Sequence, residues 1–154
     1  KQKLDEAIKE LGSTNITAVQ GDTSSMGDLD KLFDIIRKKT GYLNIIFANA
    51  GYCAFDRLDT LSEKHFDDTF NTNVKGVLFT IQKALPLLTD GSSVILNGAA
   101  CSIDGDPDLT VYCATKAATR SFARCMTTNL KERNIRVNTL SPGVIDTPLL
   151  RKLG

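Results

Sequence analysis

The chain has 154 residues, of which 42% are hydrophobic and 24% charged, a composition typical of soluble globular proteins. This length suits one domain with a buried core. The net charge of +1 is spread along the chain, which favours neither a nucleic-acid nor an anionic membrane partner. The most apolar stretch, Gly76 to Leu88, is interrupted by Gln82, Lys83 and Pro86, so we expect no membrane-spanning segment.

The amino-terminal pattern and the cysteine content favour a cytoplasmic protein. The first ten residues form a charged amphipathic pattern, unlike a signal peptide. The chain has one histidine and no CxxC motif, so we expect no metal site. We expect reduced cysteines that mostly serve packing, at positions Cys53, Cys101, Cys113 and Cys125.

The predicted elements alternate between helices and strands. In chain order they are a helix over Lys1–Leu11, a strand over Asn15–Gln20, a helix that Ser24 or Ser25 caps and Gly41 closes, a strand over Leu43–Ala48, a long helix over about Glu63–Leu88 with room for a kink near Gly76, a strand over Ser93–Asn97, a helix over Val111–Arg133 and a strand over Ile135–Leu140. This alternation predicts an α/β fold, a doubly wound parallel sheet of Rossmann type with helices on both faces. Because ligands bind at the carboxyl ends of such strands, the loops after the strands are the place to look for a site.

The strongest chemical signal is the pair Tyr112 and Lys116, four residues apart at the start of a predicted helix. That spacing places both side chains on one helix face. A nearby ammonium favours the phenolate and lowers the pKa of a phenol, which lets it exchange a proton with a carbonyl or alcohol oxygen. Taken alone, the same spacing is also common among packing and surface residues.

Four further segments stand in a fixed order around this pair: Gly21-Asp22, Asn49-Ala50-Gly51, Asn73-Val74-Lys75-Gly76 and Ser141-Pro142-Gly143-Val144-Ile145-Asp146-Thr147. With them the chain resembles the short-chain dehydrogenases/reductases from its first residue to about Leu150. The resemblance implies that residues 1–154 are the central part of a single NAD(P)-binding, Rossmann-like domain. It also implies an oxidoreductase that transfers a hydride between NAD(P)(H) and a small carbonyl or alcohol substrate.

The resemblance implies a role for each matching residue. Tyr112 would be the general acid/base, Lys116 would lower its pKa and bind the nicotinamide ribose, and Asn73 would hold a water in the proton relay. The cofactor would be contacted by Asp22 and Thr23 at the adenine, by Asn49, Ala50 and Gly51 along the sheet edge, and by Pro142, Gly143, Ile145 and Thr147 at the nicotinamide.

Each residue also has a simpler interpretation. Asp22 could cap the next helix, and Asn49-Ala50-Gly51 and Pro142-Gly143 could be ordinary turns. Asn73 could be a surface residue at a helix kink. We expect His65 to be a solvated residue in the first turn of its helix, with no role.

The chain departs from the family pattern at its start. The family begins with a strand and a glycine-rich turn that binds the pyrophosphate, and no such segment is present here. Without those strands the segment Asn15–Gln20 would have no neighbour in the sheet. The chain also stops before the family's last strand, at Gly154. We therefore expect a fragment of a longer polypeptide, or a sheet completed by another chain.

A second departure concerns the catalytic serine, which the family places thirteen residues before the tyrosine. Here that position is Ala99, and Ser102 comes three residues too late. Loss of one donor to a developing oxyanion costs on the order of 10²–10³ in rate. An engineered variant, an enzyme with an altered site and a catalytically weakened binding or regulatory protein all remain open.

The resemblance extends to cofactor and assembly. Overall similarity to bacterial-type members favours NADP over NAD. Family members commonly pair through two long helices, so we expect a homodimer or homotetramer through Glu63–Leu88 and Val111–Arg133. Packing within the subunit could use the same residues as this interface, and the candidates for the buried face are Thr115, Ala118, Phe122 and Cys125.

Overall fold

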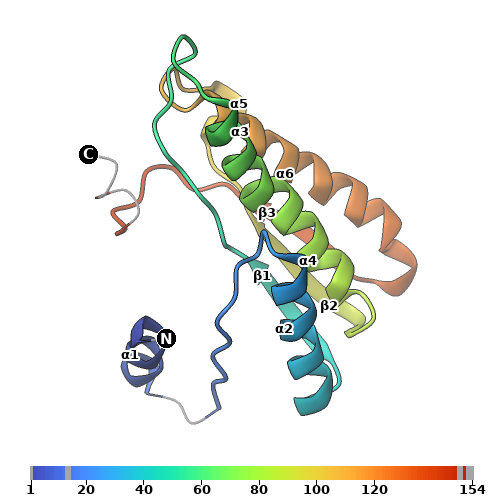
Figure 1. The fold of residues 1–154 in the computed structure, drawn as a ribbon. Helices are drawn as coiled ribbons and strands as arrows, with labels where there is room; N and C mark the ends of the chain where they lie inside the picture. The colour runs from blue at the N-terminus through green and yellow to red at the C-terminus, as the bar shows by residue number, and fades with distance from the viewer. Residues whose placement is uncertain (1, 13–14, 149–150, 152–154) are drawn as a thin grey trace.

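The computed structural model describes residues 2–12, 15–148 and 151, and the elements alternate as Figure 1 shows. The helices are α1 (Gln2–Leu11), α2 (Met26–Lys39), α3 (Glu63–Phe70), α4 (Val77–Ala84), α5 (Cys101–Asp104) and α6 (Thr110–Asn129), with a π-helical turn η1 (Asn71–Gly76) and a 3₁₀ turn η2 (Lys131–Arg133). The strands are β1 (Leu43–Ala48), β2 (Leu88–Asn97) and β3 (Arg136–Leu140).

The strands form one parallel sheet in the order β1-β2-β3. The register pairs Ala48 with Leu96 and Asn97 with Leu140, so the carboxyl ends of all three strands meet at one edge. The predicted parallel α/β arrangement is confirmed for these three strands. The loops that follow them therefore lie next to one another.

The predicted strand over Asn15–Gln20 is wrong, because this segment is extended but belongs to no sheet. A strand needs a hydrogen-bonded neighbour, and the described residues offer none beside it. The segment instead leads from α1, which Figure 1 draws apart from the sheet, to α2. Ser25 caps α2 by accepting a hydrogen bond from Asp28 N.

The long helix predicted after Ser62 is interrupted. A π-helical turn at Asn71–Gly76 separates α3 from α4, and the segment after Ala84 is no longer helical. Such wide turns occur often at functional sites. The next long helix also ends early, at Asn129, where a 3₁₀ turn and the left-handed Asn134 (φ 53°) lead into β3.

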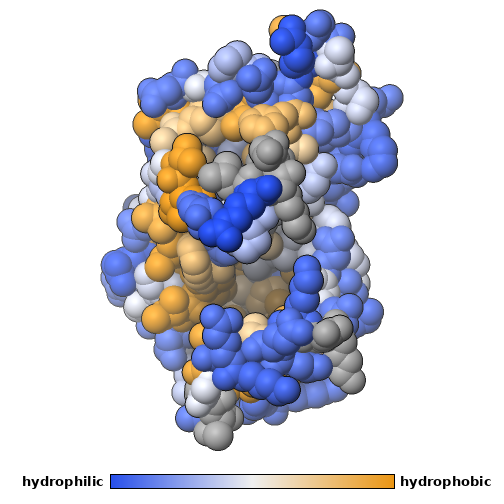
Figure 2. Space-filling view, turned by 90° about the vertical axis from the view of Figure 1, so that its left-hand side faces the viewer, coloured by the Kyte–Doolittle hydropathy of each residue, from blue (hydrophilic) through white to orange (hydrophobic). Residues whose placement is uncertain are grey.

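The core lies between one face of the sheet and the helices α4 and α6. Val94 and Leu96 of β2 are fully buried, and Ile81 of α4 is 1% exposed. On the other face of β1, Ile45 is 66% and Phe47 52% exposed. Figure 2 shows apolar surface lying open around a hollow on one side of the molecule. Within the described residues, helices α4 and α6 thus cover one face of the sheet, and the exposed side chains of β1 lie on the other.

Three further findings concern the described residues. No helix there combines the length and apolar character needed to cross a membrane. No group of three or more acidic, histidine or cysteine side chains there is placed to hold a metal ion. The cysteines are free thiols: Cys53 and Cys113 are buried, Cys101 is half-buried and Cys125 is exposed.

Candidate functional site

The loops at the carboxyl edge of the sheet are tied together by hydrogen bonds. The side chain of Asn97, at the end of β2, donates from Nδ2 to Asn49 Oδ1 at 2.8 Å. Gly98 N donates to Leu140 O at 2.7 Å. A Cβ on Gly98 would lie 2.7 Å from Cγ2 of Thr139, so only glycine fits this close approach between β2 and β3. The edge is therefore a rigid platform built from three chain segments.

Helix α6 places Tyr112 and Lys116 over this platform. Lys116 is 4% exposed, and its Nζ donates to Asn97 O at 2.7 Å. The same Nζ lies 5.4 Å from the centre of the Tyr112 ring, and Tyr112 itself is half-buried. The predicted pair thus shares one helix face, and its ammonium is anchored to the sheet edge.

Asn73, in the π-helical turn, is held by polar groups on opposite sides. Its Oδ1 accepts from Tyr52 N at 2.8 Å, and its Nδ2 donates to Tyr52 O at 2.8 Å and to Thr115 Oγ1 at 3.1 Å. Thr115 Oγ1 in turn donates to Tyr112 O at 2.6 Å. Asn73 is 1% exposed, so it is not the surface residue of the simpler interpretation.

Gly51 lies between these groups. A Cβ built there would be 3.5 Å from Asn73 Oδ1 and 3.7 Å from Lys116 Nζ. Residues from the loop after β1, from η1 and from α6 therefore converge on one point: Gly51, Asn73 and Lys116, with Tyr112 beside Lys116. The structure brings together the central residues that the sequence predicted.

The electrostatics differ from the sequence prediction. Burial raises the pKa of Tyr112 to about 12, and the neighbouring thiols of Cys53, Cys101 and Cys113 act in the same direction. Burial also lowers the pKa of Lys116. The lowering of the Tyr112 pKa expected from Lys116 is not seen in this structure, where burial of the phenol is the largest cause of the raised pKa.

Asp22 does not cap α2 but closes its own turn. Its Oδ1 accepts from Ser24 N and Ser24 Oγ, both at 2.8 Å, and its carboxylate is exposed. The adjacent Thr23 presses against Gly76, where a Cβ would lie 3.0 Å from Thr23 O. Asp22 and Tyr52 line a common pocket of about 380 Å³, which joins this turn to the Asn49-Ala50-Gly51 loop.

The loop after β3 is less firmly attached. Ala100 N donates to Pro142 O at 2.9 Å, which ties Pro142 to the platform. Gly143, Ile145 and Thr147 are exposed, and Asp146 pairs with Arg151 at 2.7 Å. The structure thus brings Pro142 to the sheet edge and leaves the other three predicted nicotinamide residues on the surface.

Ala99 lies directly after Gly98 on the platform. Its carbonyl accepts from Ser102 N at 3.1 Å at the start of α5, and its side chain has no donor. Ser102 Oγ is buried with no hydrogen-bond partner. The position that the sequence analysis singled out therefore lies at the sheet edge and carries no hydroxyl.

Comparisons with known proteins agree with this geometry. A family model for enoyl-(acyl carrier protein) reductase matches residues 1–154. A solved short-chain dehydrogenase/reductase from Brucella melitensis superposes with a TM-score of 0.90 at 28% identity, covering 94% of this chain and 62% of its own. The chain belongs to the short-chain dehydrogenase/reductase family.

Other members of the family are similar over nearly the whole chain. Oxidoreductase asL5 of Sarocladium schorii is 41% identical over 154 residues, which is 99% of this chain and 61% of the relative. Elsinochrome reductase 1 of Elsinoe fawcettii is 36% identical over 149 residues, which is 96% of this chain and 55% of the relative. A short-chain dehydrogenase of Burkholderia cenocepacia J2315, solved in complex with NADP, has a TM-score of 0.86 at 29% identity, covering 96% of this chain and 60% of its own. The chain thus spans about three fifths of the length of these relatives.

Several residues around the centre of this short-chain dehydrogenase/reductase were not predicted from the sequence. Tyr52 and Thr115 hold Asn73, and Asn97 holds Lys116. Their positions offered a signal, since Tyr52 follows Gly51 directly and Thr115 precedes Lys116. Thr115 is fully buried within the subunit, which agrees with the alternative that this residue packs inside the subunit.

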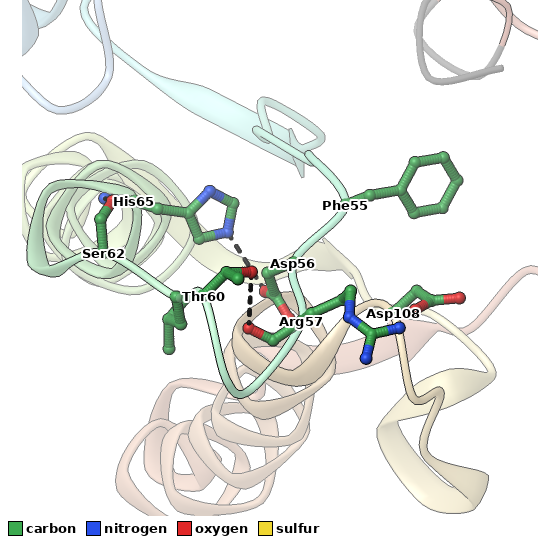
Figure 3. Close-up of a pocket in the computed structure, with 8 residues that line it drawn as sticks. Phe55, Asp56, Arg57, Thr60, Ser62, His65 and Asp108 are labelled. Atoms are coloured by element: carbon green, nitrogen blue, oxygen red, sulfur yellow. Dashed lines mark hydrogen bonds and ion pairs between the residues drawn. The ribbon is translucent and has the colours of Figure 1, made fainter.

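His65 is a further correction. Its side chain is 16% exposed, not solvated, and its Nε2 lies 3.2 Å from Oδ2 of the buried Asp56. Figure 3 shows the two side chains facing each other in a pocket of about 490 Å³ between the loop after β1 and the segment before α6. Asp108 and Phe55 also line this pocket, which includes none of the predicted site residues.

Proposed function

We propose that the protein is an NAD(P)-dependent oxidoreductase that transfers a hydride between the nicotinamide and a carbonyl or alcohol substrate, with Tyr112 as the general acid/base. The observation that carries this proposal is the convergence of Tyr112, Lys116, Asn73 and Gly51 at the carboxyl edge of the sheet. Names of relatives such as elsinochrome reductase support the reductive direction.

The residues present fit the nicotinamide half of such a cofactor. Lys116 Nζ is buried and has one described hydrogen-bond acceptor, Asn97 O, which leaves donor capacity for a ribose hydroxyl. Gly51 keeps the adjacent edge free of a side chain. Asn49, Ala50 and Pro142 would line the cofactor along this edge, and Asp22 and Thr23 would lie at the adenine. When bound, the cofactor would supply or accept the hydride.

The chain's own groups then handle the proton. The phenol of Tyr112, whose pKa burial raises to about 12 in the absence of cofactor, is protonated near neutrality and can donate its proton to a carbonyl oxygen. Lys116 would orient the ribose and the phenol together. Asn73, fixed by Tyr52 and Thr115, would keep the π-helical turn open toward the site, in the proposed role of a water-holding residue.

The proposal is tested by the substitution Tyr112→Phe in the full-length protein. Binding of NADPH and NADH is first measured by nicotinamide fluorescence, which also decides the cofactor preference that we propose to favour NADP. Consumption of the preferred cofactor is then followed with a panel of aldehydes, ketones and quinones. We expect Tyr112→Phe to bind the cofactor and abolish turnover; full activity in this variant would refute the mechanism.

Ala99 favours a second candidate, a catalytically weakened member of the family that binds a cofactor and serves binding or regulation. The substitution Ala99→Ser separates the two candidates. In the enzyme we expect the restored hydroxyl to raise turnover, by up to about 10²-fold if it again contacts the developing oxyanion. Unchanged turnover, with unchanged cofactor binding, would indicate that the site has been rebuilt without this donor.

The assembly is also a proposal, namely a homodimer or homotetramer in the cytoplasm. The interface would use exposed parts of the long helices, such as Phe66, which is 43% exposed and stacks on Phe70 at 4.3 Å between ring centres, and Cys125. Sedimentation of the purified full-length protein measures the number of subunits. A monomer at micromolar concentration would contradict this assembly.

A further inference from the structure

Asp56 is a buried carboxylate that the proposed chemistry leaves unused. Among the described residues, the buried charged groups are Asp56, at 7% exposure, and Lys116, at 4%. Asp56 comes from the loop between β1 and α3 and lies in the pocket of Figure 3. Because a buried carboxylate loses its hydration, it needs several strong partners to remain ionised.

Its partners are at the amino end of α6. Oδ1 accepts from Thr110 N at 2.9 Å, and Oδ2 accepts from Val111 N at 3.2 Å. Asp56 N also donates to Asp108 O at 2.8 Å. The carboxylate therefore satisfies two of the free N–H groups at the start of the helix and carries the negative charge that this end favours.

The helix has no local substitute for this cap. Its N-cap residue is Leu109, whose side chain makes no capping hydrogen bond. By contrast, Ser25 and Ser62 cap α2 and α3 from the adjacent position. A local serine would be sufficient to stabilise the helix end. The distant carboxylate does something more, because it joins α6 to the loop that follows Gly51.

The first turn of α6, to which Asp56 is bonded, carries the reactive tyrosine. Tyr112 directly follows Val111, and Lys116 lies one turn farther along α6. A shift of the first turn would therefore move the phenol relative to both Lys116 and Asn73. His65 fixes the other side of Asp56 through its Nε2 at 3.2 Å from Oδ2.

We propose that Asp56, held by His65, is a positioning residue that fixes the first turn of α6 and thereby the place of Tyr112 at the site. This role rests on the proposed oxidoreductase function. The Asp56–His65 pair would then have a role although neither residue contacts the cofactor or the substrate in the proposed mechanism.

The test compares Asp56→Ala and Asp56→Asn with the control Thr40→Ala in the full-length protein. Thr40 caps the end of α2 through Oγ1 to Ile36 O at 3.1 Å, at the opposite edge of the sheet. Each protein is measured for its unfolding midpoint, for kcat and KM, and for the solvent deuterium isotope effect on kcat. Tyr112→Phe is run in the same assay.

We expect Asp56→Ala to lower kcat by about 10- to 100-fold, since small displacements of a catalytic group have effects of this size. The solvent isotope effect should rise, because the proton step becomes more limiting. Asp56→Asn should be intermediate, since its remaining carbonyl oxygen still accepts from Thr110 N. Thr40→Ala should lower the unfolding midpoint while kcat and the isotope effect stay unchanged.

Unchanged kcat and isotope effect in a folded Asp56→Asn or Asp56→Ala protein would overturn the positioning role, as would failure of both variants to fold. The proposed function is judged separately by Tyr112→Phe. If that variant stays active, the acid/base assignment itself fails. If it is inactive while the Asp56 variants keep parental kinetics, only the positioning role is lost.

Discussion

Substitution of Thr115 by valine replaces a hydroxyl group at the centre of the site with a methyl group of similar size. Thr115 is fully buried, and its Oγ1 accepts from Asn73 Nδ2 at 3.1 Å and donates to Tyr112 O at 2.6 Å. In Thr115→Val both hydrogen bonds are lost. Asn73 keeps its hydrogen bonds to Tyr52, but one hydrogen of its amide group is left without an acceptor in a site that is closed to water.

The expected loss of stability follows from these contacts. A buried donor without an acceptor costs about 1–3 kcal/mol, whereas Tyr112 O is a helical carbonyl that retains other acceptor capacity. For a chain of this size each kcal/mol lowers Tm by about 2–4 °C. We therefore expect Thr115→Val to reduce the free energy of unfolding by about 1–3 kcal/mol, chiefly through Asn73.

A matched control lies one helical turn away. Thr119 is also fully buried, but its Oγ1 donates only to Thr115 O at 3.0 Å within the same helix. Thr119→Val leaves no side-chain donor without an acceptor, so we expect a smaller loss, below about 1 kcal/mol. Urea denaturation of the full-length protein measures both variants. Equal losses for the two substitutions would refute the argument that Asn73 depends on Thr115.

Two other predictions concern the platform and the phenol. Gly98→Ala should destabilise the fold by about 1–3 kcal/mol, because its Cβ would lie 2.7 Å from Thr139 Cγ2. Gly27→Ala in α2 is the control: a Cβ there meets no atom within 4 Å, so we expect it to stabilise the fold by up to about 1 kcal/mol. Thermal unfolding distinguishes them, and equal effects would contradict the close approach of β2 and β3. In an alkaline absorbance titration without cofactor, the Tyr112 phenolate should form with a pKa of about 12, and Tyr112→Phe should remove that step. Since folding raises this pKa, the phenol's contribution to stability is complete below its unfolded value and is lost as the pH rises toward 12. Ionisation of Tyr112 near neutrality would show that the Lys116 ammonium outweighs burial.

The sequence predicted the alternation of elements well because each helix and strand has a local pattern of apolar residues. It failed at Asn15–Gln20, whose pattern is that of a strand but whose pairing depends on a neighbour that local sequence cannot supply. Strand formation thus depends less on local sequence than helix formation does, and the wrong prediction falls where a tertiary contact determines the structure.

For the site, the spacing of the motifs was sufficient to find the residues that the structure brings together, namely Tyr112, Lys116, Asn73 and Gly51. Two features could not be predicted in this way. The pKa of Tyr112 depends on burial, which the order of residues does not reveal, and the contact of Asp56 with Thr110 spans a sequence separation of 54 residues. Contacts of that range leave no periodic signal.

The π-helical turn makes the helix that carries Asn73 sensitive to its length. Thr69, Asn73, Val77 and Ile81 are all buried at intervals of four residues, and the wide turn keeps these positions on one side. Removing a single residue between 71 and 76 would let the segment close as an ordinary α-helix, and the wide turn that carries Asn73 would be lost. Substitutions at the exposed positions Asn71 and Lys75 can be accommodated one at a time, but a deletion would displace Asn73 from Tyr52 and Thr115. This segment should therefore vary at its exposed positions before it varies in length.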